Sequence, residues 1–469
     1  MLFNSIEFAF FLPIVFTIYW FVFNKSLKIQ NGFLLYASYY FYFWWDWRFL
    51  SLIALSTIVD YIVGLRIESS HEQHIRKRWL QLSLGVNLGI LGFFKYYNFF
   101  IESWVNAFAA MGYEMSPFTL QIILPVGISF YTFQTLSYSI DIYRKKLKPT
   151  KDFIAFAAFV SFFPQLVAGP IERARNLLPQ FKMKRVLEDK MILPAINMIL
   201  WGLFKKIGIA DRIAPYVNEV FSKSEIYSSI PVLIAVSLFA VQIYCDFSGY
   251  SDIARGVAAL FGFRLMENFR SPYLALSLND FWHRWHISLS TWFRDYVYIP
   301  LGGNRVGSFK RDRNILITFG LSGLWHGANW TFLVWGLIHG IALLVESRVS
   351  KLQFFKQHLS VKVVKWCLTM LVVNLAWVFF RADDLTHAFS MLGTIMTLSL
   401  PAGFSETLAT QSPLFMLINI FVILIAIGKN VLFSIKTRVG DSLAITYVLI
   451  ILIYLLGTSG EQDFIYFQF

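Results

Sequence analysis

The sequence between residues 314 and 345 reads Asn-Ile-Leu-Ile-Thr-Phe-Gly-Leu-Ser-Gly-Leu-Trp-His-Gly-Ala-Asn-Trp-Thr-Phe-Leu-Val-Trp-Gly-Leu-Ile-His-Gly-Ile-Ala-Leu-Leu-Val, without any Asp, Glu, Lys or Arg. As one α-helix this run would extend roughly 48 Å, against an apolar bilayer core about 30 Å thick. The run is too long for one upright span and too short for two. Glycines at positions 323, 327, 336 and 340 can interrupt a helix. We therefore predict a helix break here, enclosed by protein or by a water-filled cavity.

An ionisable side chain lies inside this run. His326 stands within Gly-Leu-Trp-His-Gly-Ala-Asn-Trp (323–330), and such a residue at membrane depth indicates a functional site. A neutral imidazole in a dry pocket can take a proton from a hydroxyl, so His326 is our candidate general base. The alternative is a core histidine that hydrogen-bonds a carbonyl freed by the break. For the second histidine, His339, packing is the favoured interpretation.

The composition indicates a membrane protein. The chain has 469 residues, of which 57% are apolar and 15% are charged, whereas soluble domains carry about 25% charged residues. We predict an all-α polytopic integral membrane protein with about eleven transmembrane helices, give or take two. The stronger candidate runs are residues 8–24, 118–140, 153–171, 226–245, 407–428 and 442–460, and the weaker ones are residues 29–45, 49–65, 79–101, 191–204 and 366–380. No internal repeat or long hydrophilic stretch appears, so residues 1–469 are expected to form one integral domain.

The basic residues predict the orientation. The formal net charge of +13 arises from Lys and Arg in short loops between apolar runs, which is typical of a membrane protein and not of a nucleic-acid-binding protein. These residues fall in every second loop, at positions 25–28, 66–78 and 144–151, whereas the intervening loop, residues 102–118, contains neither Lys nor Arg. The positive-inside rule then predicts cytoplasmic basic loops and an N-terminus outside.

Two segments depart from simple membrane crossing. Residues 153–171 lie between two basic loops and contain Pro164 and Pro170, which break helices, so we predict a re-entrant or tilted segment. Residues 264–313 mix basic and aromatic side chains. Their centre, residues 279–298, has an apolar stripe, and we predict an amphipathic helix in the cytoplasmic leaflet that Asn279 caps and Pro300 ends.

That helix would carry two histidines, His283 and His286, whose i, i+3 spacing places them on one face. A zinc site needs further ligands and usually a Glu, as in His-Glu-x-x-His, but Arg284 and Trp285 stand between these histidines. We therefore expect no metal. His286 is either an interfacial histidine with a wet tip or a second histidine that lines one cavity with His326.

Charged residues also stand at the ends of two other apolar runs. Asp246 and Asp252 lie in the segment 242–252. Asp246 either orients a histidine or pairs with a nearby arginine, and for Asp252 structural pairing is favoured. Lys205 and Lys206 form a basic cluster, which can bind lipid headgroups or the phosphates of a cytosolic donor.

The last residues form an aromatic tail, Phe-Ile-Tyr-Phe-Gln-Phe (464–469), within the segment 461–469. Apolar tails are normally anchored. This tail is either part of an aromatic belt at the membrane interface or a plug that enters the protein's own cavity and presents the hydroxyl of Tyr466.

Three motifs together carry a family resemblance: Gln-Ile-Tyr-Cys-Asp-Phe-Ser-Gly-Tyr-Ser-Asp (242–252), Trp-His-Ile-Ser-Leu-Ser-Thr-Trp-Phe-Arg-Asp-Tyr-Val-Tyr-Ile-Pro-Leu-Gly-Gly-Asn-Arg (285–305) and Gly-Leu-Trp-His-Gly-Ala-Asn-Trp (323–330). The chain resembles the membrane-bound O-acyltransferase (MBOAT) family, nearest its alginate O-acetyltransferase branch and more distantly the D-alanyl transfer proteins. Residues 4–20 and 203–206 are also similar to that branch. The resemblance implies helices around a central funnel, in which a cytoplasmic acyl donor meets an acceptor from the outer side.

The resemblance also implies roles for individual residues. His326 matches the family's catalytic histidine, and His286 matches the second histidine of the D-alanyl transfer branch. In that branch a small partner protein ends in an aromatic tail similar to residues 464–469, which implies that Tyr466 is an acyl relay carried in cis. The residues expected to contact substrates are Trp325, Asn329, Arg284 and Asp246, with Lys205, Lys206 and Arg294 guiding the donor's phosphates.

The resulting hypothesis is an O-acetyltransferase of the bacterial inner membrane. Its donor is expected to be a thioester, acetyl-CoA or an acyl carrier, and no tightly bound cofactor is expected. His326 would act as the base and His286 would position it or stabilise the developing charge. The acetyl group would reach an extracytoplasmic polysaccharide, an exopolysaccharide or peptidoglycan, directly or through Tyr466 and a secreted partner. The alternative is a transporter or flippase of a lipid-linked or acyl substrate, which makes no bond; transporters commonly contain paired interrupted helices, and no such repeat appears here.

Overall fold

The structure is a computed structural model that describes residues 1–349, 358–397, 442–458 and 464–465. Within these ranges all regular structure is helical. The chain forms two compact units. Unit 1 holds Met1–Ile196 and Ile253–Met266, and unit 2 holds Asn197–Asp252 and Glu267–Phe469. Two helices contain residues of both units, α10 (Asp189–Leu203) and α12 (Ser229–Leu260).

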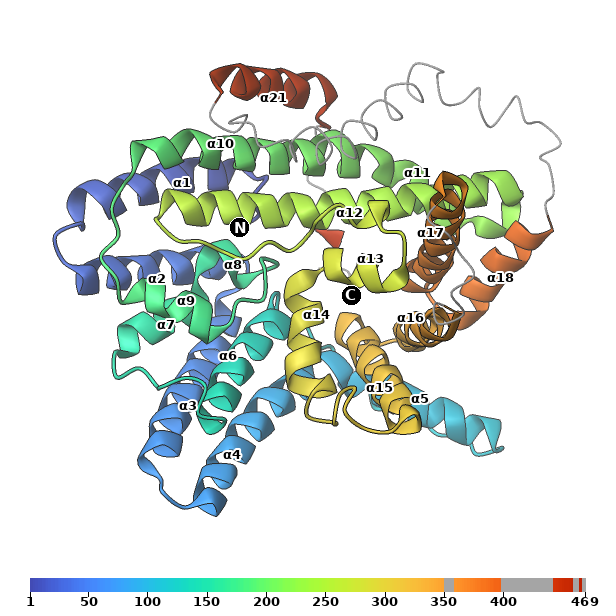
Figure 1. Cartoon of the computed structure of the whole chain (residues 1–469), viewed down its shortest axis with the longest axis horizontal. Helices are drawn as coiled ribbons and strands as arrows, with labels where there is room; N and C mark the ends of the chain where they lie inside the picture. The colour runs from blue at the N-terminus through green and yellow to red at the C-terminus, as the bar shows by residue number, and fades with distance from the viewer. Residues whose placement is uncertain (350–357, 398–441, 459–463, 466–469) are drawn as a thin grey trace. The chain divides into compact units, whose positions relative to one another are not determined.

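A buried carboxylate joins three helices of unit 1. Asp60 on α3 accepts hydrogen bonds from Asn87 Nδ2 at 2.7 Å, from Ser139 Oγ at 2.6 Å and from Ser83 Oγ, which joins α3 to α4 and α6. A buried carboxylate needs such donors because burial removes its hydration. The helices of this unit, seen in Figure 1, are α1 (Ile6–Thr17), α2 (Leu27–Phe43), α3 (Leu50–Ser69), α4 (Gln73–Leu91), α5 (Tyr97–Ala110), α6 (Ile128–Tyr143), α7 (Phe153–Ser161), α8 (Phe163–Leu166) and α9 (Ala174–Phe181).

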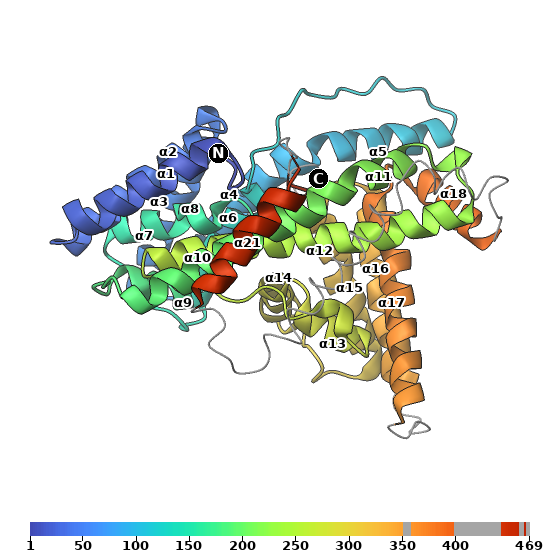
Figure 2. The same ribbon diagram turned by 90° about the horizontal axis from the view of Figure 1, so that it is seen from above.

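Unit 2 carries the three motifs of the family resemblance. Its α15, α16 and α17 pack in sequence against one another, as Figure 2 shows. One large apolar core includes Trp285, Trp335 and Trp377, all fully buried. The elements that begin in this unit are η4 (Phe204–Ala210), α11 (Asp211–Ser222), η5 (Ser224–Ile226), α12, η6 (Pro272–Leu274), α13 (Leu278–Arg284), α14 (Ile287–Phe293), η7 (Arg294–Tyr298), α15 (Ser308–His326), α16 (Trp330–Val349), α17 (Leu359–Arg381), α18 (Leu385–Met396) and α21 (Leu443–Leu456).

Among the described residues, five helices are long and apolar enough to cross a membrane. They are Trp47–Ser69, Asp189–Ser222, Ser229–Leu260, Trp330–Val349 and Leu359–Arg381, and shorter apolar helices cover Ile6–Val22, Leu385–Met396 and Leu443–Leu456. The predicted all-α polytopic class is confirmed. The total of about eleven spans stays a prediction.

The break predicted in the uncharged run lies directly beside His326. α15 ends at His326, residues 327–329 are not helical, and α16 begins at Trp330. The two helices approach closely because glycines lie between them: a Cβ on Gly323 would stand 2.1 Å from the Phe332 carbonyl oxygen, and one on Gly336 would stand 2.2 Å from that of Phe319. The run is therefore a tight helical hairpin.

Other predicted runs differ from the structure or lie outside it. Residues 118–140 are helical only from Ile128, because Pro125 and Gly127, with φ of 76°, precede α6. Residues 153–171 are broken as predicted, since α7 ends at Ser161 and α8 carries Pro164 in its first turn. Whether this segment is re-entrant stays a prediction, and the run 407–428 lies outside the described residues.

The single amphipathic helix predicted over residues 279–298 is wrong. The segment forms α13, α14 and the π-helix η7, and the chain turns between α13 and α14. His286, at this turn, adopts the left-handed conformation with φ of 42°, which interrupts a right-handed helix. Ser277, and not Asn279, caps α13. His283 is exposed and His286 is buried, so the two do not share a helix face.

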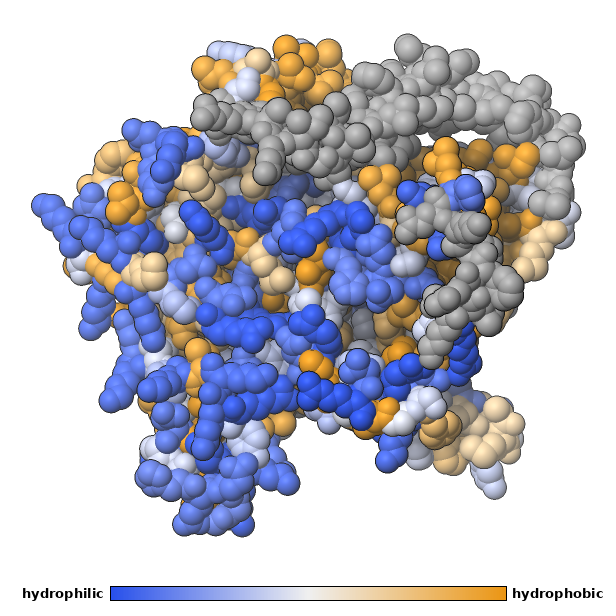
Figure 3. All heavy atoms as spheres, viewed as in Figure 1, coloured by the Kyte–Doolittle hydropathy of each residue, from blue (hydrophilic) through white to orange (hydrophobic). Residues whose placement is uncertain are grey.

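The surface of α21 is strongly apolar. Leu443, Tyr447 and Tyr454 are 62%, 65% and 85% exposed, and Figure 3 shows hydrophobic residues gathered over this helix. The same view shows hydrophilic residues where α3 meets α4 in unit 1. An exposed apolar helix, with hydrophilic residues gathered at other helix ends, is typical of a protein that faces lipid.

Gly336→Ala is predicted to lower the free energy of unfolding by about 1–3 kcal/mol, because the new methyl group overlaps the Phe319 carbonyl and the hairpin must open. Thermal unfolding in detergent measures the change. The control is Gly393→Ala on α18, where an added Cβ meets nothing within 4 Å; it should leave stability unchanged or raise it slightly. Equal stability of the Gly336 variant and wild type would contradict the close approach.

Candidate active site

His326 lies at the end of α15 in a cage of aromatic rings. Only 2% of its surface is exposed. Its ring centre lies 5.0 Å from those of Trp325 and Trp335, 5.3 Å from that of Phe380, and 6.2 Å from that of His286. The three carbon-rich neighbours come from α15, α16 and α17 and exclude bulk water from the imidazole, which strengthens electrostatic interactions inside the site.

His286 is fixed by the turn between α13 and α14. Its left-handed backbone is uncommon for a residue with a Cβ, and the next N–H, that of Ile287, donates to the Asn268 carbonyl at 3.0 Å. The Asn268 side chain meets the histidine ring as well, with Oδ1 at 3.3 Å from His286 Nδ1. Both residues belong to unit 2. Through these two contacts Asn268 fixes the backbone conformation at His286 and the orientation of its ring.

These contacts assign the tautomer of His286. Asn268 Oδ1 accepts from the Ser288 N–H at 3.1 Å and from Ser288 Oγ at 2.9 Å, so this atom is the amide oxygen and Nδ1 of His286 must present a proton to it. His286 lies outside the candidate membrane spans, and its burial lowers its pKa to about 3. The ring is therefore neutral near pH 7, with its lone pair on Nε2.

The described part of the aromatic tail lies beside this pair of histidines. Phe464 and Ile465 are 2% and 4% exposed. The Phe464 ring centre lies 5.7 Å from that of Phe247, and Phe247 lies 4.7 Å from His286. Ile465 belongs to the same apolar core as Trp335 and Phe380, the residues that surround His326. Tyr466 lies outside the described residues.

A buried ion network holds the tail's backbone. Asp246 Oδ2 accepts from the Ile465 N–H at 2.7 Å, and its Oδ1 lies 2.8 Å from Lys206 Nζ. Lys206 also pairs with Asp211 at 2.8 Å. Of the two interpretations left open for Asp246, pairing with a cation holds, but the cation is a lysine. Lys206 therefore balances the negative charge of the Asp246 carboxylate while that carboxylate binds the backbone of the tail.

The lysine pair predicted to bind donor phosphates is buried. Lys205 Nζ lies 2.8 Å from Asp252 Oδ2 and donates to Ser248 Oγ at 2.8 Å, while Lys206 joins the Asp246 network. The side chains of Lys205 and Lys206 are 4% and 8% exposed. The structural pairing favoured for Asp252 is thus present, and both ammonium groups have carboxylate partners inside the protein. A phosphate-binding role for them stays a prediction.

A cavity of about 500 Å³ opens in unit 2 between α13, α14, α15 and α16, a volume within the range of small-molecule sites. Arg294, His283 and Glu346 lie among its polar lining residues, and Ser322 lines it one helical turn before His326. Trp282 also lines it and contacts His339. His339 in turn contacts Trp335, which touches His326. The cavity therefore approaches the histidine from the side of α13.

The remaining predicted substrate residues occupy different positions. Trp325 packs against both histidines, 5.9 Å from His286 between ring centres. The side-chain N–H of Asn329 donates to the Asp383 carbonyl, and its Oδ1 accepts from the Thr331 N–H. Asn329 thereby joins the start of α16 to the residues that follow α17. Arg284 pairs with Asp280 on α13 at 2.8 Å and Arg294 with Asp295 at 2.8 Å. The structure therefore brings Trp325 and the two histidines together. It places Asp246 against the tail and gives Asn329 and Arg284 structural contacts.

Sequence reasoning missed Asn268, which is 1% exposed, and Phe380 of the aromatic cage. Asn268 is a lone amide between Glu267 and Phe269, 18 positions before the histidine whose tautomer it sets. No periodicity links the two. An amide in a segment otherwise rich in aromatic residues is the one signal that could have selected it, because buried amides need partners.

The chain belongs to the membrane-bound O-acyltransferase family. The family model described as "MBOAT, membrane-bound O-acyltransferase family" matches residues 144–381, a range that contains both histidines and Asn268. The protein is a multi-pass membrane O-acyltransferase.

Among the curated relatives, two resemble most of the chain and a third resembles a smaller part of it. It is 42% identical over 400 residues to the "Probable alginate O-acetylase AlgI" of Azotobacter vinelandii, covering 85% of this chain and 78% of the relative. It is 38% identical over 421 residues to the "Peptidoglycan O-acetyltransferase" of Helicobacter pylori, covering 84% and 79%. A more distant relative is the "Teichoic acid D-alanyltransferase" of Streptococcus thermophilus, 30% identical over 240 residues, with 47% and 56% covered.

Stability is predicted to fall as the pH drops from about 6.5 towards 3. The pKa of His286 is lower in the folded protein than in the unfolded chain, so in this window the unfolded chain binds the extra proton and acid favours unfolding. The slope from one such group is about 1.4 kcal/mol per pH unit at most.

Thermal midpoints measured in detergent across this pH range test the prediction. His286→Gln should flatten the acid side of the profile, whereas His283→Gln, which changes an exposed histidine of α13, should keep the wild-type profile. The buried neutral state of His286 is wrong if the His286 variant and wild type respond identically to acid.

Proposed function

We propose that this protein transfers acetyl groups from a cytoplasmic thioester to hydroxyls of an extracytoplasmic polysaccharide, an exopolysaccharide or peptidoglycan. The observation that carries the proposal is the buried pair of histidines: His326 at the tip of the α15–α16 hairpin, and His286 at the turn between α13 and α14. The names of the relatives, alginate O-acetylase and peptidoglycan O-acetyltransferase, support acetyl as the group and a glycan as the final acceptor.

His326 serves as the general base. It removes the proton from the attacking hydroxyl as the oxygen bonds to the thioester carbonyl carbon. The carbon–sulfur bond then breaks, and the leaving thiolate takes the proton back from His326. His286, neutral with its lone pair on Nε2, acts as a hydrogen-bond acceptor that stabilises the positive charge His326 acquires. Asn268 keeps His286 in that tautomer.

The donor enters through the cavity between α13 and α16. Its volume of about 500 Å³ accommodates a slender thioester arm, and Ser322 marks its inner wall. Arg294 lines the cavity, is 56% exposed and pairs with Asp295 through Nε; in this proposal its guanidinium also binds the phosphates of acetyl-CoA or of a carrier's prosthetic group. No tightly bound cofactor is needed for this chemistry.

Tyr466 is the first acceptor in this proposal. Its neighbours Phe464 and Ile465 are buried beside Phe247 and Asp246, which supports an inserted tail over an interfacial belt. The Asp246–Lys206–Asp211 network positions the tail, because Asp246 accepts its backbone N–H within the same core that surrounds His326. A tyrosyl ester would carry acetyl from the donor's side towards the outside.

The proposal includes a cellular setting. The chain lies in the cytoplasmic (inner) membrane of a bacterium with its N-terminus outside, as the basic loops indicate. A secreted acetyltransferase or other polysaccharide-modifying partner collects the acetyl group from Tyr466 and delivers it to the glycan. This arrangement connects a cytosolic donor with a glycan on the opposite side of the bilayer.

His326→Ala is predicted to lower donor-dependent acetylation by about 10²–10⁴-fold, the usual contribution of a general base. Purified protein is incubated with acetyl-CoA or an acetylated carrier, and thiol release is followed. The matched control is His339→Phe, since His339 stacks parallel to Phe281 and its ring nitrogens have no hydrogen-bond partner among the described residues. The control should retain most activity. Wild-type turnover by the His326 variant would exclude the general-base role.

Tyr466→Phe is predicted to abolish transfer to the glycan while leaving the fold intact, because it removes one hydroxyl and little packing. Mass spectrometry of the peptide that contains residue 466, after incubation with donor and without acceptor, should detect one added acetyl group in wild type and none in the variant. Tyr454→Phe, at an 85% exposed position of α21, is the control. Normal glycan acetylation by the Tyr466 variant would leave the tail as an anchor only.

A further inference from the structure

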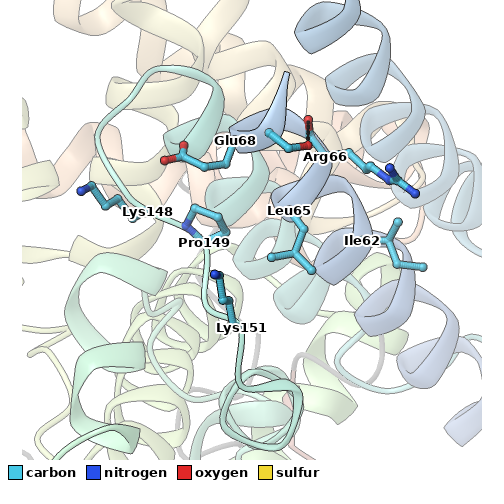
Figure 4. Close-up of a pocket in the computed structure, with 8 residues that line it drawn as sticks. Ile62, Leu65, Arg66, Glu68, Lys148, Pro149 and Lys151 are labelled. Carbon is cyan, nitrogen blue, oxygen red and sulfur yellow. Dashed lines mark hydrogen bonds between the residues drawn. The ribbon is translucent and has the colours of Figure 1, made fainter. Parts of the chain in front are cut away.

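A second cavity lies in unit 1, where α3 meets the loop after α6. Its volume is about 680 Å³, and its lining includes Arg66 from the last turn of α3 and Lys148 and Lys151 from the loop. Figure 4 shows Arg66, Leu65 and Ile62 on the helix and Lys148, Pro149 and Lys151 on the facing chain. The loop is tied to the helix, because the Tyr61 hydroxyl donates to the Lys151 carbonyl at 2.7 Å.

The charge of this cavity is unbalanced. Three cations line it, and Glu68 is the one carboxylate in its lining. Within the described part of the chain the structure gives Arg66, Lys148 and Lys151 no ion pair, in contrast to Lys205 and Lys206, which are both paired with carboxylates. A cavity with surplus positive charge and unpaired cations suits a phosphate-bearing anion.

An apolar stripe on α3 leads into the cavity. Leu55, Ile58 and Ile62 are 46%, 46% and 45% exposed, and Leu65 lines the cavity itself. Their spacing of i, i+3, i+7 and i+10 places them on one helix face. From Leu55 to Leu65 the stripe is about 15 Å long, roughly the apolar thickness of one leaflet. Because α3 is a candidate membrane span, this face is available to an acyl chain.

We propose that the cavity binds one anionic phospholipid. Its phosphate lies among Arg66, Lys148 and Lys151, and an acyl chain lies along Leu55, Ile58 and Ile62. A soluble phosphate anion would use the cations but not the stripe, and a zwitterionic lipid would bring its own cation to a site that already carries surplus positive charge. The combination therefore selects a lipid with a net negative headgroup. This site does not depend on the acetyl-transfer proposal.

The full-length protein is placed in phosphatidylcholine nanodiscs that contain a minor fraction of phosphatidylglycerol, and the retained lipid is read by native mass spectrometry after release into detergent. Wild type should retain phosphatidylglycerol. The triple variant Arg66→Gln, Lys148→Gln, Lys151→Gln should bind it on the order of a hundredfold more weakly, at about fivefold per basic residue. The charge-matched control is Lys77→Gln, Lys145→Gln, Lys146→Gln, which removes three exposed cations outside the cavity and should retain the lipid as wild type does.

A competition experiment shows whether the site binds the phosphate of a lipid headgroup or a soluble phosphate anion. Inorganic phosphate, compared with chloride at the same ionic strength, should not displace the lipid; displacement would make the site a soluble-anion site and overturn the proposal. Equal retention of phosphatidylcholine, or equal loss in both triple variants, would overturn it too. If the cavity variant has a lowered thermal midpoint, the three single variants are measured instead, and unchanged retention in all of them counts against the site.

Discussion

α15 and α16 approach each other so closely that a methyl group on Gly323 or Gly336 would overlap the backbone of the facing helix. The hairpin must turn within residues 327–329, and His326 is thereby held at its tip. α16 supplies Trp335 to the cage around this histidine, and α17 supplies Phe380. The position of the proposed base thus follows from a backbone contact that only glycine permits, and the cage follows from the helices that this contact aligns.

The second histidine depends on a different constraint. A left-handed residue with a Cβ costs on the order of 1–3 kcal/mol. His286 keeps this conformation because Asn268 accepts a hydrogen bond from the following backbone N–H, that of Ile287, and also contacts the His286 ring. The same burial that lowers its pKa makes it a hydrogen-bond acceptor near pH 7. Dipoles fixed before the reaction need no reorganisation when charge develops, which suits the proton transfer proposed for this buried site.

The sequence predicted the class of fold and the helix break beside His326, because both leave local signals; the role of His326 as the base stays a prediction. An uncharged run longer than a bilayer, interrupted by glycines, indicated a break near His326, and the break lies there. The helix predicted over residues 279–298 failed because the apolar stripe continues across the turn at His286, so periodicity alone does not reveal it. Lys206 read as a surface cation because its partners Asp211 and Asp246 are brought together by the fold. No pattern in the sequence pairs Asn268 with His286, because the fold brings these two residues together from 18 positions apart.

An acetyltransferase forms a covalent bond to its acceptor, whereas a transporter or flippase does not. In the proposed mechanism, acetyl passes from sulfur to oxygen inside the aromatic cage, and Tyr466 of the tail is proposed to supply the hydroxyl. In a flippase, the same cage would enclose a substrate that leaves chemically unchanged. The most direct test is mass spectrometry of surface polysaccharides from cells with and without this protein. The account predicts that its presence adds the mass of one acetyl group per modified sugar, while an unchanged glycan mass with an altered amount of surface glycan would contradict it.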